Sequence, residues 1–274
     1  MGRKSIANYG TIFVFLEKLN YAPGQQINGT ISINLQANFP SSSIIMLLEG
    51  KEKVLFWTER TETRTYGHGE NQRTETITHH DPHYGTNRCY NHSFPVASFD
   101  TPYVPAGQYQ IPFTFKLGEQ APSSFDYSWY QDRNSYAKIS YHVKCLMESR
   151  GNCKDLLKSK TCFYVNAGID RPIKQRQGEL KDEVTVCCCF NKGEVYVKAY
   201  FEKDAYMPGE TAIMIAEVAN KSSIGVFAIE GNLINTLNLR ANDGHTRNLS
   251  LTLSQVKSHG LKAGESKTGQ NAQR

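Results

Sequence analysis

Apolar and polar residues alternate with a period of two along much of this chain, which is the pattern of half-buried β-strands. Residues 27–35, 109–117 and 138–145 show it most clearly, because their apolar side chains recur with a spacing of two and polar residues lie between them. Residues 10–19 are apolar at most positions and predict a strand covered on both faces. A sustained helical period of 3.6 is absent from the sequence, so the pattern predicts an all-β protein.

Four further features refine this picture. Residues 58–66 and 73–78 alternate threonine, glutamate and arginine around a glycine-containing turn, which predicts a long, solvated hairpin. Pro112 cannot donate a hydrogen bond within its strand and therefore favours an edge or a bulge. Residues 154–158 suggest a single helical turn, and His142 is expected on the exposed, polar face of its strand.

A short motif occurs twice and suggests a duplicated domain. Tyr21-Ala22-Pro23-Gly24 returns as Tyr206-Met207-Pro208-Gly209, each time between two apolar segments. Proline fixes φ at the first corner of a type II turn and glycine accepts the positive φ at the second, so both motifs predict strand-turn-strand units. We therefore expect a β-sandwich at residues 1–168, a linker at 169–182, and a second sandwich with a polar tail at 183–274.

Composition agrees with a soluble, intracellular, two-domain protein. The 274 residues include 21% charged and 39% hydrophobic residues, and the apolar runs are much shorter than a membrane span. The N-terminus lacks the apolar core of a signal peptide. Seven cysteines, three of them contiguous at 187–189, predict reduced thiols rather than a disulfide framework. The net charge of +5 is spread along the chain and does not indicate a nucleic-acid partner.

Several motifs, in their order along residues 10–256, resemble the arrestin family, and within it the α-arrestins or arrestin-domain-containing proteins. The matching segments of the first half are Tyr21-x-Pro23-Gly24 with Gly29-x-Ile31, Trp57-Thr58-Glu59, Pro105-x-Gly107 with Phe113-x-Phe115, Pro122-Ser123-Ser124-Phe125, and Tyr141-x-Val143-Lys144. Those of the second half are Cys187-Cys188 with Gly193, Tyr206-x-Pro208-Gly209-Glu210, and Glu217-x-x-Asn220-x-Ser222-Ser223. The resemblance implies two immunoglobulin-like sandwiches in tandem. The second is expected to be incomplete, because the family's second domain normally continues beyond the equivalent of Val256, and the natural product is then longer or relies on a partner.

The resemblance also implies a function. Such a protein is a non-enzymatic adaptor without a cofactor, which binds cytoplasmic tails or loops of membrane proteins and directs their endocytosis, ubiquitination or intracellular trafficking. Its partners would include a WW-domain ubiquitin ligase or coat proteins, and it would be cytoplasmic, with peripheral association at the plasma membrane or endosomes. Arg3 and Lys4 are the candidate contacts for a phosphorylated cargo, because they precede the first strand at the spacing that the family uses.

The sequence also departs from the family. It has no Pro-Pro-x-Tyr motif for ligase recruitment, and Asp81-Pro82-His83-Tyr84 differs from that motif by one residue. Pro82 and Tyr84, predicted in an exposed loop, are therefore weak candidates for docking on a WW domain. The arginine of the phosphate-sensitive ion-pair network is not found at the expected strand, so a phosphate-triggered release is not predicted.

Two alternatives remain open. The chain could be a cargo-selecting coat subunit on endosomes, similar to the arrestin-fold component of retromer. It could instead be a metal-binding β-protein that uses the histidine-rich residues 79–92, although their spacing fits no standard zinc pattern. Motifs for nucleophilic or phosphate chemistry are absent from the sequence, so neither an enzymatic activity nor a bound metal is predicted.

Overall fold

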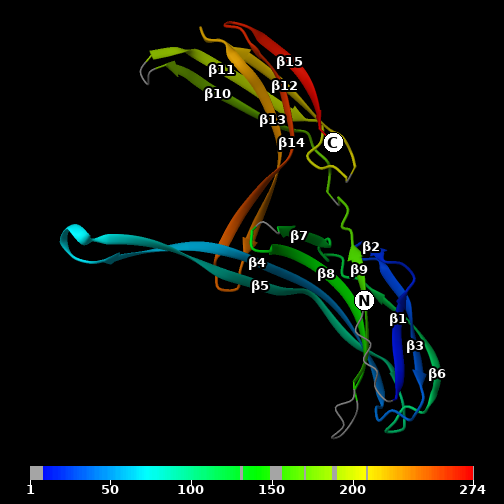
Figure 1. The fold of residues 1–274 in the computed structure, drawn as a ribbon. Helices are drawn as coiled ribbons and strands as arrows, with labels where there is room; N and C mark the ends of the chain where they lie inside the picture. Colours follow the sequence, from blue (N-terminus) through cyan, green and yellow to red (C-terminus); the bar gives the residue numbers. More distant parts are fainter. Residues whose placement is uncertain are drawn as a thin grey trace. The chain divides into compact units, whose positions relative to one another are not determined.

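The structure is a computed structural model that describes residues 9–129, 132–148, 156–169, 171–186, 190–207 and 209–273. These residues are almost entirely β-strand, which confirms the all-β prediction (Figure 1). The chain divides into two compact units. Unit 1 consists of Met1–Ala167 and Leu239–Arg247, and unit 2 consists of Gly168–Asn238 and Asn248–Arg274. Among the described residues, no helix has the length and apolarity needed to cross a bilayer.

The first nine strands belong to unit 1 and form two sheets. Their bounds are β1 (Gly10–Leu16), β2 (Asn20–Tyr21), β3 (Gln26–Leu35), β4 (Ser43–Tyr66), β5 (Arg73–Ser98), β6 (Gly107–Lys116), β7 (Phe125–Trp129), β8 (Ser135–Glu148) and β9 (Leu156–Val165). One sheet has the order β1-β3-β6, and the other has the order β2-β9-β8-β4-β5 with β7 paired to β8. All these pairs are antiparallel except β2 with β9.

The core of unit 1 lies between the inner faces of these sheets. As the alternation predicts, every second side chain of β3 is buried, including Ile27, Ile31 and Ile33. The facing sheet contributes Leu48 of β4 and Tyr141 of β8 to the same hydrophobic cluster. The sandwich therefore follows from two half-buried sheets that cover each other's apolar faces.

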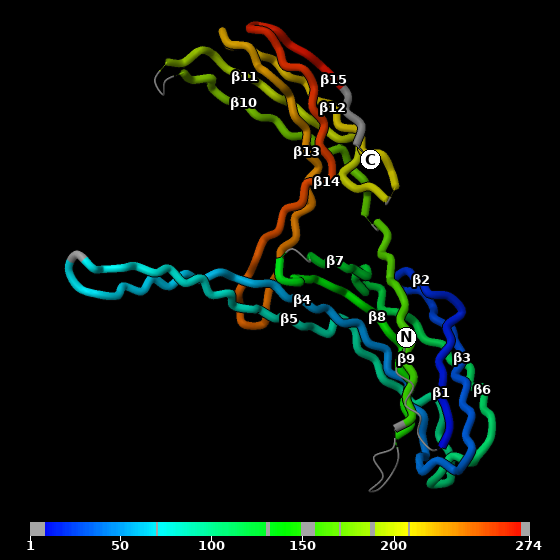
Figure 2. Tube along the Cα trace, viewed as in Figure 1, coloured from blue at the N-terminus to red at the C-terminus, as the bar shows by residue number. Residues whose placement is uncertain are grey.

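The predicted polar hairpin is confirmed. β4 and β5 pair without interruption from Trp57 opposite Pro82 to Tyr66 opposite Arg73, and the short 3₁₀ segment η1 (Gly69–Asn71) lies at the turn. Figure 2 shows the two strands running side by side to the end of this hairpin. Most side chains there are exposed, since an isolated pair of strands has no sheet to cover it.

Three predictions about individual strands have different outcomes. Pro112 lies in β6, which among the described strands pairs with β3 alone, so its predicted edge position is confirmed. β1 is covered on one face rather than both, because Phe13 and Phe15 point away from the core and are exposed. The helical turn predicted at residues 154–158 is wrong in its described part, because β9 begins at Leu156.

The two Pro-Gly turns have the same hydrogen bonds. In unit 1, Gln25 N–H donates to Ala22 C=O (3.1 Å), the Gln25 side chain accepts from Ala22 N–H (3.0 Å), and Gly24 has φ +74°. Pro23 and Gly24 are therefore the corners of the predicted type II turn.

The turn of unit 2 repeats this arrangement. Glu210 N–H donates to Met207 C=O (3.0 Å), the Glu210 carboxylate accepts from Met207 N–H (3.0 Å), and Gly209 has φ +88°. Pro208 lies outside the described residues. The similarity also includes the lysine three residues before each tyrosine. Lys18 Nζ lies 5.1 Å from the centroid of the Tyr21 ring, and Lys203 Nζ lies 5.4 Å from that of the Tyr206 ring.

Unit 2 contains two smaller sheets. Its strands are β10 (Arg176–Val186), β11 (Phe190–Phe201), β12 (Ala212–Asn220), β13 (Val226–Arg240), β14 (Thr246–Leu261) and β15 (Ser266–Gln273), of which β13 and β14 continue into Leu239–Arg247 of unit 1. One sheet has the order β10-β11-β12-β15, and β13 pairs with β14. The linker predicted at 169–182 needs correction, because residues from Arg176 onward pair with β11. Their charged side chains had hidden this edge strand.

Unit 2 buries much less apolar surface than unit 1. Val218, Leu249 and Leu261 are its buried large apolar residues among those described, whereas Phe227 is 92% exposed and Phe190 is 66% exposed. The fold therefore agrees with the prediction of two tandem β-sandwiches.

Candidate functional site: a lysine-lined groove in unit 1

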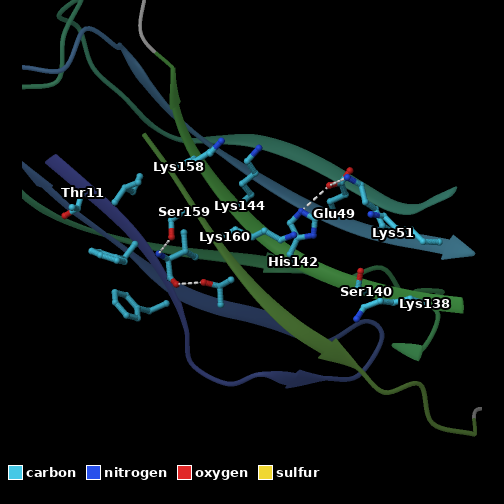
Figure 3. A pocket seen from close by; sticks show the side chains of 16 residues that line it. Thr11, Glu49, Lys51, Lys138, Ser140, His142, Lys144, Lys158, Ser159 and Lys160 are labelled. Carbon is cyan, nitrogen blue, oxygen red and sulfur yellow. Dashed lines mark hydrogen bonds and ion pairs between the residues drawn. The ribbon is translucent and has the colours of Figure 1, made fainter. Parts of the chain in front are cut away.

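Unit 1 has a groove where the outer face of its larger sheet meets β1 of the smaller sheet. It has a volume of about 720 Å³ and is lined by residues of β1, β4, β8 and β9. Figure 3 shows several lysines among its labelled side chains, which come from neighbouring strands. Six lysines line it: Lys51, Lys53, Lys138, Lys144, Lys158 and Lys160.

Strand alternation explains why these lysines gather. On β8, Tyr141 and Val143 point into the core, so Lys138 and Lys144 must point to the opposite face. The register of β8 and β9 places Lys144 directly opposite Lys160. The basic face is thus built from every second residue of adjacent strands.

Like charges face each other across this sheet. Lys144 pairs with Lys160, and Lys53 pairs with Lys138. Like charges in directly opposed positions destabilise a sheet. An anionic ligand that bridges them would remove this repulsion.

Two of the six lysines already have carboxylate partners. Lys51 Nζ lies 2.8 Å from Glu49, and Lys138 Nζ lies 2.6 Å from Asp126. Among the described residues, no carboxylate pairs with the other four, which are Lys53, Lys144, Lys158 and Lys160. These four ammonium groups are available to a ligand.

A buried acid-histidine pair lies under the groove. Glu49 is 4% exposed and contacts Lys51, Arg88 (3.1 Å) and His142 Nε2 (3.1 Å). Burial raises the pKa of the Glu49 carboxyl, but the hydrogen bond from Lys51 and the charges around it outweigh this effect, so the pKa is below its usual value. Glu49 is therefore ionised at neutral pH and partly balances the lysines.

His142 is buried, so its predicted exposure is wrong. Burial and the charge of Lys160 lower its pKa to about 4, although Glu49 acts in the opposite direction. At neutral pH the ring is therefore uncharged, and its Nε2 lies 3.1 Å from the Glu49 carboxylate. Packing of β9 beside β8 covers the ring, and this could not be seen from the alternation of one strand.

The wall formed by β1 is apolar. Phe13 and Phe15 are 41% and 58% exposed, and their ring centroids lie 6.3 Å apart. The backbone of Val14 is already occupied: its N–H donates to Ser159 Oγ (3.2 Å), and its C=O accepts from Thr161 Oγ1 (2.6 Å). The groove thus offers a ligand aromatic rings on one side and ammonium groups on the other.

The binding residues predicted from sequence lie elsewhere. Arg3 and Lys4 are outside the described residues. Pro82 and Tyr84 lie within β5, paired with Trp57 and Leu55, and not in the exposed loop that was predicted. Tyr84 is nevertheless 59% exposed.

The histidines of residues 79–92 do not converge on one point. They lie along β5, where His79 contacts Glu62 and His80 contacts Glu59. Among the described residues, His83 alone of this group joins a cluster with metal-ligand geometry, and its companions there are Asp243 and His245 from another part of the chain.

The six groove lysines were missed at the sequence level. The sequence feature that could have indicated the groove was the presence of lysines on the polar faces of two segments, Lys138 to Lys144 and Lys158 to Lys160. Each looks like an ordinary solvated strand face, and only the strand order brings them together.

Comparison with known proteins agrees with this architecture. Residues 13–171 match the family model "Arrestin (or S-antigen), N-terminal domain", and residues 191–273 match "Arrestin (or S-antigen), C-terminal domain". Over 214 residues the chain is 29% identical to Arrestin domain-containing protein A of Dictyostelium discoideum, an alignment that covers 77% of this chain and 35% of that protein. Over 212 residues it is 25% identical to Arrestin domain-containing protein 17 of Caenorhabditis elegans, with 74% and 46% covered. The chain therefore spans less than half the length of these relatives. The matches to both domain models show that the chain belongs to the arrestin family.

Proposed function

We propose that this chain is a non-enzymatic adaptor that binds acidic or phosphorylated cytoplasmic segments of membrane proteins in the lysine-lined groove of unit 1. Bound cargo is then directed to endocytosis, ubiquitination or intracellular trafficking. The observation that carries the proposal is the set of four groove lysines without a described carboxylate partner, three of which lie directly opposite another lysine.

The groove suits an extended peptide with both acidic and apolar side chains. Ammonium groups on β8 and β9 would pair with carboxylates or phosphates, while the exposed rings of Phe13 and Phe15 would contact apolar side chains. The side chains of Ser159 and Thr161 already form hydrogen bonds with the backbone of Val14 at the β1 edge. A peptide is therefore more readily recognised there through its side chains than by adding a strand to β1.

The expected affinity is modest. A hydrogen bond to a charged group contributes about 1.5–3 kcal/mol. Two such contacts correspond to a dissociation constant between millimolar and tens of micromolar, and aromatic contacts improve on this. Stable recruitment would then require several contacts on one membrane, through avidity.

Fluorescence anisotropy with the full chain tests the proposal. The probes are a labelled peptide with alternating phosphoserine and leucine, its unphosphorylated form, and a neutral peptide of equal length. We expect the phosphopeptide to bind most tightly, and Lys144→Glu and Lys160→Glu each to weaken it about tenfold, the equivalent of one lost ionic contact. Binding should also weaken as salt is raised.

Lys192→Glu is the matched control. Lys192 is an exposed strand lysine of unit 2, so the same charge reversal there should leave peptide affinity within twofold of the unmodified chain. Equal losses in Lys192→Glu and Lys144→Glu would show that only net charge matters and would refute a groove site.

Affinity capture from cells separates the downstream roles. Recovery of a WW-domain ubiquitin ligase supports the ubiquitination role, and a Tyr84→Ala variant tests whether β5 contributes to it. Stoichiometric recovery of coat subunits instead would favour a retromer-like cargo-selecting subunit.

A further inference from the structure

Two histidines and an aspartate come together in unit 1, away from the lysine-lined groove. Their potential ligand atoms all lie within 4.8 Å of one another. His83 belongs to β5, whereas Asp243 and His245 flank Gly244 in the turn between β13 and β14, a segment that is part of unit 1. Two imidazoles and one carboxylate form a donor set typical of transition-metal sites.

The His83 ring is fixed on three sides. Its Nε2 lies 2.8 Å from Thr58 Oγ1, and its faces meet Phe56 (5.4 Å between ring centroids) and His245 (4.0 Å). The 2.7 Å contact with Asp243 is a hydrogen bond that His83 Nδ1–H donates to Oδ2, so that Nε2 accepts from the Thr58 hydroxyl. A metal ion bound at Nδ1 would replace that proton, and Nε2–H would then donate to Thr58. A ligand histidine usually donates its second N–H to an oxygen in this way.

The turn that carries the other two ligands is held independently. Asn242 N–H donates to Tyr84 C=O (2.9 Å), and Asn242 Oδ1 accepts from Thr86 N–H (3.1 Å). Within the turn, Ala241 N–H donates to His245 C=O (2.9 Å), and Gly244 accepts a φ of +90° that most residues avoid. The ligands are therefore brought near one another without help from an ion.

Small movements complete the geometry of a bound ion. Donors of a tetrahedral zinc site with bonds of about 2.0–2.1 Å lie about 3.3 Å apart. The 2.7 Å contact would open slightly, and the wider separations, all of which are within 4.8 Å, would close by rotation of side chains. Asp243 and His245 are exposed enough to rotate, while His83 is buried and stays in place.

We propose that His83, Asp243 and His245 bind one divalent transition-metal ion, with zinc as the preferred ion and a fourth position open to water. Imidazole donors favour zinc, cobalt, nickel and copper over magnesium and calcium, whose sites use oxygen ligands. The ion would join β5 to the turn and would not touch the groove lysines, so this site is separate from the proposed peptide site.

Metal titration of the full chain tests this site. After treatment with a chelator, the chain is titrated with Zn²⁺ by calorimetry and with Co²⁺ by visible absorption. We expect one equivalent to bind with a Co²⁺ spectrum of nitrogen and oxygen ligands. His245→Ala, which changes an exposed side chain, should weaken Zn²⁺ binding more than the 10–100-fold usual for loss of an outer-shell contact.

Two further variants sharpen the result. Thr58→Val retains all three ligands and removes the hydroxyl that orients His83, so it should weaken Zn²⁺ binding by about 10–100-fold. His92→Ala, a histidine of β5 outside the cluster, should leave the affinity unchanged. The proposal is overturned if His245→Ala binds Zn²⁺ as tightly as the unmodified chain, if no equivalent binds, or if Co²⁺ shows thiolate charge-transfer bands.

Discussion

Each of the two units contains a turn of the same type, but the structure around the turn differs between the units. Both Pro-Gly motifs form the same pair of hydrogen bonds, with a glycine at positive φ and a lysine over the preceding tyrosine ring. Unit 1 encloses a continuous hydrophobic cluster, whereas the described part of unit 2 leaves many large apolar side chains exposed. The residues that form the turn, and their hydrogen bonds, are thus repeated in both units. The core and the groove instead depend on the order of strands in the sheets.

The largest difference between the units should be the loss of stability when one buried leucine in each unit is replaced by alanine. Leu48 in unit 1 is fully buried, so Leu48→Ala should cost about 3–5 kcal/mol. Leu249 is also buried, but unit 2 has fewer buried apolar side chains, so Leu249→Ala should cost only about 2 kcal/mol. Both tryptophans, Trp57 and Trp129, belong to unit 1, so urea unfolding followed by tryptophan fluorescence reports that unit.

Circular dichroism follows strand content in both units and provides the second readout. Leu249→Ala should shift the dichroism curve and leave the fluorescence midpoint in place. A fluorescence shift as large as that of Leu48→Ala would show that the two units unfold as one and would remove the contrast.

The buried Glu49–His142 pair should make unit 1 sensitive to acid. The pKa of His142 is about 4 in the folded chain against 6.5 when exposed, so between these values the unfolded chain binds one more proton. Stability should therefore fall with pH from 6.5 to 4, with a slope of up to about 1.4 kcal/mol per pH unit. Above about pH 5.5 this slope is due mainly to His142, because Glu49, whose pKa is lowered on folding, binds few additional protons in the unfolded chain at that pH.

The matched variant for this slope is His142→Gln, which keeps a hydrogen-bond donor beside Glu49 and cannot titrate. Urea midpoints from tryptophan fluorescence at several pH values should become flatter in this variant. If the unmodified chain shows no slope over this range, His142 is not buried in its neutral form.

The shared turn predicts equal effects in both units. Gly24→Ala and Gly209→Ala each force an L-residue into a positive φ, which should cost about 1–2 kcal/mol. Gly24→Ala should be slightly worse, because its added Cβ would lie 3.2 Å from Glu119. A neutral effect at either position, measured by urea unfolding, would mean that this turn does not need its glycine.

The smallest effect concerns the side chains that close the turns. Gln25→Ala and Glu210→Ala each remove one hydrogen bond to an exposed backbone N–H, and each should lower the midpoint of thermal unfolding only slightly, by less than the glycine substitutions do. Glu210 also contacts Lys203 (3.2 Å), so its loss should depend more on salt than that of Gln25. The same salt dependence in both variants would contradict this assignment.

The strands and turns could be predicted from sequence because they depend on neighbouring residues. Alternation located β3, β6 and β8, and glycine chemistry located both turns. The groove could not be predicted in this way, since Lys144 and Lys160 become neighbours only through strand register. The same limit applies to His83 and Asp243, which lie far apart in sequence and meet through the turn held against β5.

Protection of lysines from acetylation, read by mass spectrometry of the full chain, tests the groove most directly. With the phosphoserine-leucine peptide bound, Lys144, Lys158 and Lys160 should be protected, while Lys192 and Lys267 react as they do without peptide. Peptide binding that leaves the groove lysines as reactive as before would contradict the proposed site.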